Sequence, residues 1–331
     1  MQFNLKKYSV IVGKNIGYFL LFSFLLFIIS HNVAGDPLRS YYGDNIERMS
    51  TLEKEKAREQ LGLDKPIGIQ YTIWLSRMIQ GDFGTSLKYK QPVKQVLTQF
   101  LGNTIRLVGI SYPLLFVCSF LLGGYCAENE NKKMDKIVCF IGTMFLCIPT
   151  FWLAFCLIFL FSVVFPILPS SGVYQIGEEG NILFYVRYFL LPVFILVLEH
   201  LFYYSYFIRN RFLEEMKKQY ILFALSKGMS RKEAIWNYAR RSVLPFFISL
   251  FTTSFPHFLG GSYVIEIIFS YKGMGTLAFE SAKYHDYSVL MLVCIVTAIF
   301  TLFINKMGEI LCIYIDPRRK KEWIGGKFYE K

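Results

Sequence analysis

The chain has 331 residues, of which 54% are hydrophobic and 18% aromatic, and its formal net charge is +12. This apolar content, with a mean hydropathy of +0.38, excludes an ordinary soluble globular domain and indicates an integral membrane protein. A basic chain can bind nucleic acid through phosphate contacts, but here Lys and Arg are gathered in short segments between apolar runs, as in cytoplasmic loops. We therefore expect this chain to contact a lipid bilayer and no nucleic acid.

Six apolar segments are long enough to cross about 30 Å of hydrocarbon as helices, which satisfy their own backbone hydrogen bonds. They cover residues 10–30, 104–126, 137–165, 182–208, 244–269 and 287–315. Lys6 and Lys7 precede the first segment, as in a signal peptide, but its apolar core is longer than such peptides have. We interpret it as an uncleaved anchor and predict an all-α integral membrane protein with six transmembrane helices.

A polar segment of about 70 residues separates the first two apolar runs. Residues 52–63 form a charged helical pattern, residues 69–79 an amphipathic one, and Gly81 to Gly84 a tight turn. We therefore divide the chain into residues 1–100, an anchor helix with a small extracytoplasmic segment, residues 101–315, a five-helix membrane domain, and residues 316–331, a basic tail.

Charge in the short loops predicts the orientation. The loop between the fourth and fifth runs is rich in Lys and Arg, whereas the loop from Gly172 to Gly180 has none and carries Glu178 and Glu179. Because positive loops stay inside, the basic loop and both termini are predicted to be cytoplasmic.

Cysteine and histidine usage gives no sign of a metal or catalytic site. The seven cysteines lie in apolar stretches without a C-x-x-C pair, and the four histidines lack metal-ligand spacing. Asp36 and Asp82 lie among turn-forming glycine and proline residues, where Asp commonly bonds the local backbone. We expect neither a resident metal nor catalysis by this chain.

The cytoplasmic loop 209–245 is longer than a simple connection requires. Residues 220–226 are apolar and compatible with a helix, Gly228 can end that helix, and Ser230 with Glu233 can cap a second one. We expect Ile221, Leu222 and Leu225 to share one face of the first helix and to offer an apolar knob to a partner.

This loop carries a family resemblance. Residues 220–230, YILFALSKGMS, followed by Leu244 and Pro245, resemble the ATPase-contacting "EAA" loop of ABC importer permeases, in the form found in the dipeptide, oligopeptide and nickel family. Matches extend along the chain as LGLDKP at 61–66, GDFGTS at 81–86, IPTFWL at 148–153, LPSSG at 168–172, VIEIIF at 264–269, GMG at 273–275 and DP at 316–317. At the "EAA" positions this chain instead has Leu222, Phe223 and Ala224.

The resemblance implies a type I ABC importer permease fold in a bacterial cell membrane. It implies a second permease subunit, two ATPase subunits that bind ATP and Mg, and an external solute-binding protein. This chain has no G-x-x-x-x-G-K-[ST] motif to cradle phosphate, so we expect it to bind no cofactor. The residues that the resemblance assigns to ATPase coupling are Tyr220, Leu222, Phe223, Ala224, Lys227, Gly228, Leu244 and Pro245.

Charged and polar residues inside the apolar runs are candidates for the translocation path, because intramembrane charge usually faces protein or water. They are Glu199, His200, Tyr203 and Glu266. Helix packing is the alternative role for Glu199 and His200, the interfacial aromatic belt is the alternative for Tyr203, and Glu266 is either structural or close to a gate. Lys306 and Glu309 are expected to pair with one another.

The resemblance favours short peptides as cargo, with nickel or another metal chelate as the alternative. Sequence does not separate the two. A channel or carrier without an ATPase is a different class, which a functional intramembrane charge relay would favour. An intramembrane enzyme lacks a recognisable nucleophile with its base.

Overall fold

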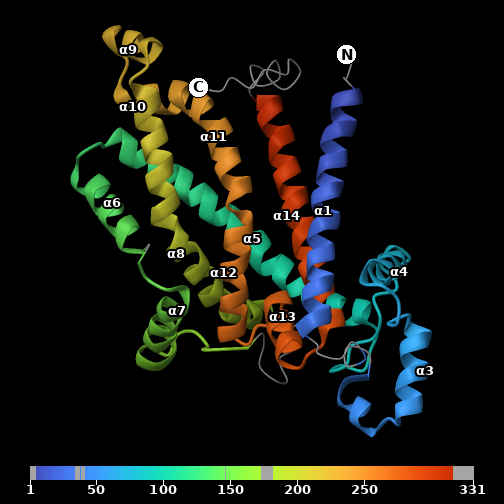
Figure 1. Ribbon diagram of the computed structural model, residues 1–331. Coiled ribbons are helices and arrows are strands. Elements are labelled where there is room, and N and C mark those ends of the chain that lie inside the picture. The colour runs from blue at the N-terminus through green and yellow to red at the C-terminus, as the bar shows by residue number, and fades with distance from the viewer. Residues whose placement is uncertain (1–4, 34–37, 39–41, 146, 173–181, 316–331) are drawn as a thin grey trace. The chain divides into compact units, whose positions relative to one another are not determined.

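The computed structural model describes residues 5–33, 38, 42–145, 147–172 and 182–315 (Figure 1). The predicted turn at Asp36, the acidic loop with Glu178 and Glu179, and the basic tail 316–331 lie outside this range. Within it, regular structure is helical except for one isolated antiparallel bridge between Thr85 and Pro92. The prediction of an all-α fold is confirmed.

The chain forms two compact units, residues 1–102 with 276–300 and residues 103–275 with 301–331. The first unit contains α1 (Leu5–Val33), the 3₁₀ helix η1 (Gly43–Arg48), α3 (Thr51–Leu61) and α4 (Ile67–Ile79). The second contains α6 (Lys133–Phe145), α7 (Thr150–Ile158), the π-helix η2 (Phe159–Val164), α8 (Ile182–Met216), α9 (Gln219–Ser226), α10 (Arg231–Glu233), the π-helix η3 (Ala234–Ala239), α11 (Arg240–Thr253) and α12 (Phe255–Ile268). α5 (Val93–Glu128), α13 (Met274–Lys283) and α14 (Tyr287–Ile315) have residues in both units. The predicted division into residues 1–100, 101–315 and 316–331 stays a prediction.

Four helices in the described residues are individually long and apolar enough to cross a membrane. They are Gly13–Asn32 of α1, Val93–Glu128, Tyr185–Met216 of α8 and Tyr287–Ile315. Two bent helix pairs, Lys133–Phe145 with Thr150–Val164 and Arg231–Thr253 with Phe255–Ile268, bring the number to six if each counts as one span. The chain is a multi-pass membrane protein.

The third and fifth predicted spans, 137–165 and 244–269, are each formed by a bent pair of helices. The two parts of the third are inclined by 109° and those of the fifth by 46°. Proline explains both breaks: Pro149 is the N-cap of α7, and Pro256 lies in the first turn of α12. Proline has no backbone N–H to donate and disfavours a helical residue before it.

Aromatic side chains form the interior of the second unit. Tyr112 of α5 packs its ring within 4.6 to 5.5 Å of Phe116, Phe251, Phe255 and Phe258, and its hydroxyl donates to the Phe251 carbonyl. Packing aromatic rings together buries large apolar areas, and the hydroxyl of a buried tyrosine needs a hydrogen-bond acceptor such as the Phe251 carbonyl. This cluster joins α5 to α11 and α12.

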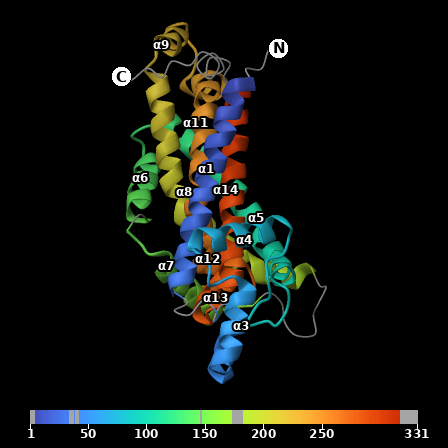
Figure 2. The same cartoon turned by 45° about the vertical axis from the view of Figure 1, so that its right-hand side comes forward.

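In the first unit, the predicted helical stretches 52–63 and 69–79 are confirmed as α3 and α4. Ser50 caps α3 in a capping box with Glu53, and Gly62 ends it in a left-handed conformation. α4 lies beside α1 (Figure 2). Tyr71 of α4 contributes to this contact, since its hydroxyl lies 2.7 Å from Ser23 Oγ. The predicted turn is also confirmed, with the Gly84 N–H donating to Asp82 Oδ1 at 3.1 Å.

A polar cluster ties residues 86–89 to α13 and the start of α14 within the first unit. Ser86 Oγ donates to the buried Asp286 carboxylate at 2.5 Å. Glu280 accepts from Lys88 Nζ, and from Tyr89 Oη at 2.6 Å. Partial burial alone would raise the pKa of Glu280, but the bonds from Lys88 and Tyr89 outweigh it and hold this pKa below its ordinary value.

Glu280→Gln is expected to weaken this cluster at neutral pH by on the order of 1 kcal/mol, since the pair is partly exposed. Because the pKa of Glu280 is lowered in the folded state, its carboxylate stabilises the fold at pH values above the unfolded-state pKa. This stabilisation is lost as the pH falls through the folded-state pKa. The difference between variant and wild type should therefore shrink at acidic pH. Amide exchange of residues 86–90, expressed as an opening free energy, measures it.

Glu55→Gln is the matched control, because Glu55 is exposed on α3. An equal effect of both substitutions, or a Glu280→Gln effect that grows on acidification, would contradict the assignment.

Candidate functional site

The loop 209–245 folds as helix, turn, helix, as predicted. α9 ends in a left-handed Gly228 with φ +90°, and the Met229 and Gly228 N–H groups donate to the Ala224 and Leu225 carbonyls. These two bonds form a Schellman motif, which satisfies carbonyls at a helix end. Ser230 then begins α10 in a capping box with Glu233. Both expected signals, Gly228 and Ser230, therefore fix the reversal of the chain.

The two faces of α9 differ from the expected arrangement. Ile221 is fully buried in the core cluster with Phe212, Met216 and Ile235, and Leu225 packs against the same cluster. Leu222 and Phe223 are 52% and 61% exposed. The prediction that Ile221, Leu222 and Leu225 form one knob was wrong, because positions four apart, 221 and 225, turn together toward the core.

The exposed knob is therefore Leu222 and Phe223, flanked by Tyr220 at 45% exposure. Lys227 extends its ammonium over the Phe223 ring, 4.5 Å from the ring centre. Ala224 is half-buried. Leu244 and Pro245 lie within α11, where Pro245 is buried, so they do not share the exposed surface of α9.

Glu215 anchors the start of α9, a role that sequence analysis missed. Its side chain is 1% exposed, and it accepts a hydrogen bond from the Tyr220 hydroxyl. Lys218 Nζ lies 2.6 Å from its second oxygen, and Ser242 Oγ of α11 lies 3.2 Å from the Tyr220 hydroxyl. The spacing of Glu215 and Lys218, three residues apart, was the available signal.

A second set of polar contacts ties α10 and η3 to the end of α5 and the residues just after it. The Arg231 guanidinium donates to the Ala127 carbonyl at 3.0 and 3.1 Å and to Glu130 at 2.6 Å. Trp236 Nε1 donates to Glu128 at 3.3 Å. Through the core cluster that contains Ile221, α9 is joined to α5, α8, η3 and α11.

Nearby, Arg209 and Asp135 join α8 to α6. Arg209 Nε and Nη2 each donate to a different oxygen of the buried Asp135 carboxylate at 2.6 Å. Such a two-bond pair fixes orientation as well as distance.

The candidate path residues Glu199, His200 and Tyr203 lie on α8. Glu199 accepts from the Thr150 hydroxyl at the start of α7, and its Oε2 is buried without a hydrogen-bond partner in the described part of the chain. His200 Nδ1 lies 3.8 Å from that oxygen, and the ring lies edge-on to His257 at 5.5 Å between centres. Tyr203 is half-buried and packs on Tyr204 and Phe207.

Glu266 is placed differently from these three. Its carboxylate is fully buried and accepts from Thr104 Oγ1 and from the Gly275 N–H, each at 2.6 Å. The Met274 N–H donates to Thr104 Oγ1 at 2.7 Å. Glu266 therefore caps the start of α13, where exposed N–H groups favour an anion.

The hydrogen bonds around Glu266 give a physical reason for the GMG pattern at residues 273–275. A Cβ on Gly273 would lie 2.4 Å from the Glu266 carboxyl carbon, and one on Gly275 would lie 2.5 Å from Tyr263 Cα. Only glycine allows the carboxylate and the α12 backbone to approach this closely.

Gly273→Ala is expected to cost about 1 to 3 kcal/mol, because the carboxylate must move from its donors. Gly260→Ala is the matched control, since nothing lies within 4 Å of a Cβ at that helical position. The melting temperature in detergent should fall for Gly273→Ala and hold or rise for Gly260→Ala. Equal melting temperatures for the two variants would contradict the proposed close contact between Gly273 and the Glu266 carboxylate.

Within the described residues, no group of three or more His, Cys, Asp and Glu side chains could hold a metal ion. All seven cysteines are free thiols.

Comparison with known proteins gives a family and a fold. The sequence profile of the family described as "Binding-protein-dependent transport system inner membrane component" matches residues 119–321. The oligopeptide transport system permease protein AppB of Bacillus subtilis is 32% identical over 295 residues, 89% of this chain and 92% of the relative. The metal-staphylopine import system permease protein CntB of Staphylococcus aureus is 26% identical over 320 residues, 97% and 98% of the two chains.

Among solved structures, the chain resembles the MetNI methionine ABC transporter in an inward-facing conformation. The TM-score is 0.56 at 16% identity, with 67% of this chain and 97% of that chain covered. At this identity the likeness shows the fold alone.

Proposed function

Because this chain belongs to the family of binding-protein-dependent transport system inner membrane components, we propose that it forms the translocation path of an ATP-binding-cassette importer for oligopeptides or dipeptides. The chain is a transporter subunit and not an enzyme, and separate ATPase subunits hydrolyse ATP. The observation that carries the proposal is α9, a short helix that exposes Leu222 and Phe223 while Ile221 is buried.

The mechanism follows from how α9 is attached. We propose that an ATPase subunit binds Leu222 and Phe223 in an apolar groove and moves when ATP closes the ATPase pair. Because Ile221 is packed in the core cluster and Glu215 holds Tyr220, α9 moves as one body with the helices behind it. The spans then rock between inward-open and outward-open arrangements.

The proposed assembly has four kinds of partner: a second, different permease subunit, two ATPase subunits, an external solute-binding protein and the bilayer. ATP and Mg belong to the ATPase subunits. We place the assembly in a bacterial cell membrane with α9 and both termini in the cytoplasm, since the basic loops favour that side.

Cysteine labelling tests this orientation. Ser226→Cys lies on exposed α9 and Lys56→Cys on exposed α3, and the wild-type chain gives the background of its own thiols. A membrane-impermeant maleimide should label Lys56→Cys in intact cells and Ser226→Cys only after permeabilisation. Labelling of Ser226→Cys in intact cells would overturn the orientation and the docking of an ATPase on α9.

Within the path, we propose that Glu199, His200 and Tyr203 lie close to the passing solute. Support comes from the Glu199 oxygen that has no hydrogen-bond partner among described residues, because a buried acceptor is costly unless a donor reaches it. We leave Glu266 out of the proposed path, since its carboxylate is fully buried and bonded to Thr104 and Gly275.

Uptake into proteoliposomes tests the function and the coupling together. With the ATPases, the second permease and the binding protein present, we expect ATP-dependent uptake of a labelled short peptide. Leu222→Asp and Phe223→Asp should each lower uptake by about tenfold or more, because a charge enters an apolar groove. Both variants should still insert into the membrane.

Leu52→Asp is the control, since Leu52 is 60% exposed on α3, far from α9 in the sequence. Unchanged uptake by both α9 variants would contradict the docking surface. Peptide transport by this chain without any ATPase would contradict the importer itself.

The alternative cargo is nickel or another metal chelate. The relative named as a metal-staphylopine import system permease favours it, while the oligopeptide permease favours peptides. If the associated binding protein holds a metal chelate tightly and no peptide, the cargo assignment changes and the coupling mechanism stays.

A further inference from the structure

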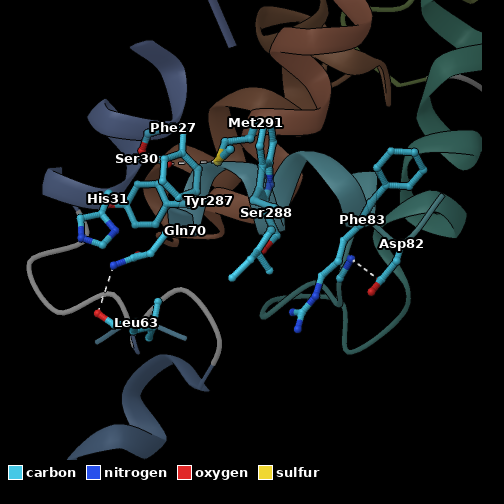
Figure 3. A pocket seen from close by; sticks show the side chains of 14 residues that line it. Phe27, Ser30, His31, Leu63, Gln70, Asp82, Phe83, Tyr287, Ser288 and Met291 are labelled. Atoms are coloured by element: carbon cyan, nitrogen blue, oxygen red, sulfur yellow. Dashed lines mark hydrogen bonds between the residues drawn. The ribbon is translucent and has the colours of Figure 1, made fainter. Parts of the chain in front are cut away.

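The first unit contains a cavity of about 110 Å³, and none of its lining residues belongs to α9 or to the proposed path residues. Its walls come from the last turn of α1, from α4 and the turn after it, and from the first turn of α14 (Figure 3). This volume holds several waters or one small polar group and is well below that of a drug-sized site.

Gln70, one of the residues that line this cavity, carries an unsatisfied acceptor. The residue is 9% exposed, and its Nε2 donates to the Leu63 and Lys65 carbonyls at 3.0 and 2.8 Å. Because these two bonds identify the nitrogen, the remaining amide atom is Oε1. This oxygen is buried and has no hydrogen-bond partner in the described part of the chain. An acceptor in that state calls for a ligand that brings an N–H or O–H donor.

The other residues that line the cavity favour a ligand that carries one positive and one negative group. Phe27, Trp74 and Tyr287 line the cavity, and aromatic ring faces attract cations. Arg77 and Asp82 line it too, with opposite charges, and neither forms an ion pair with a described residue. An ammonium would meet Gln70 Oε1, and a phosphate would meet the guanidinium of Arg77, whose planar donor set suits phosphate.

The position of the cavity indicates where such a ligand comes from. Phe27 belongs to the end of one membrane-spanning helix and Met291 to the beginning of another, and both line the cavity. The ends of spanning helices lie at the level of the lipid headgroups, where Trp and Tyr are also typical.

We propose that this cavity binds a primary ammonium joined to a phosphate, as in the headgroup of phosphatidylethanolamine. Gln70 Oε1 accepts from the ammonium, and Arg77 donates to the phosphate. A choline headgroup carries no N–H and cannot satisfy Gln70. The inference depends on the chain spanning the membrane and is independent of its cargo.

The test uses the full-length chain in its importer complex, reconstituted in nanodiscs with equal amounts of phosphatidylethanolamine and phosphatidylcholine. Native mass spectrometry after mild extraction counts the retained lipids. The wild type should retain phosphatidylethanolamine over phosphatidylcholine by about fivefold, the worth of one good hydrogen bond. Gln70→Met should bring the ratio close to one. Arg77→Gln should lower the retention of both lipids severalfold, because both carry the phosphate that Arg77 binds, while peptide uptake reports separately on the proposed function.

Lys56→Gln is the matched control, because it also removes one positive charge from the polar segment, on exposed α3 outside the cavity. Arg77→Gln keeps the test decisive if Gln70→Met disturbs folding, since Gln70 also holds two backbone carbonyls. Equal retention of the two lipids by the wild type, or total lipid retention that Arg77→Gln leaves unchanged, would overturn the proposal.

Soluble glycerophosphoethanolamine identifies the source of the headgroup. If glycerophosphoethanolamine displaces the retained lipid, the site recognises the headgroup alone and also binds soluble phosphoethanolamine esters. If it does not, the acyl chains contribute and the ligand is membrane lipid. Both results keep the ammonium and phosphate chemistry, whereas displacement by glycerophosphocholine at the same concentration would contradict it.

Discussion

Under the coupling that we propose, the function of the second unit depends on the burial of Ile221. An ATPase that grips α9 can open a membrane path only if α9 is attached stiffly to the spans. Ile221 anchors α9 in a cluster contributed by α5, α8, η3 and α11. Packed side chains at native density transmit displacement with little compression, so a movement of α9 is passed to those helices.

The same attachment is reinforced by polar groups placed around the cluster. Glu215, Arg231 and Trp236 each bond a group on another part of the loop or on α5. Polar bonds are directional, so they restrict the rotation of α9 that apolar packing alone would permit. Stiffness here comes from combining a non-directional core with directional contacts at its edge.

Much of this arrangement was predictable from the sequence, because the signals were local. Apolar length identified the spans, Gly228 and Ser230 identified the turn, and Lys306 with Glu309 form the expected pair at 2.6 Å. The breaks in the third and fifth spans were missed, since hydropathy does not register the geometry that Pro149 and Pro256 impose. The true face of α9 was missed because all of its central residues are apolar, so only the surrounding core decides which of them is buried.

Long-range polar contacts were beyond sequence analysis for a related reason. Thr150 with Glu199, Arg209 with Asp135 and Ser86 with Asp286 are separated by 49, 74 and 200 positions. Each residue alone appears as an isolated polar group, and only the fold supplies its partner. Membrane helices can carry such groups because the partner removes most of the cost of burying them.

The hydrogen bonds of Glu266 with Thr104 and Gly275 also have a consequence for the synthesis of the chain. A carboxylate entering the bilayer with α12 is unfavourable until donors surround it. Thr104 lies 162 positions earlier in the chain, and Gly275 only nine positions later. During synthesis Thr104 is therefore already in the membrane when Glu266 is made, and Gly275 is made soon afterwards. The new helix thus carries a carboxylate without hydrogen-bond donors only briefly.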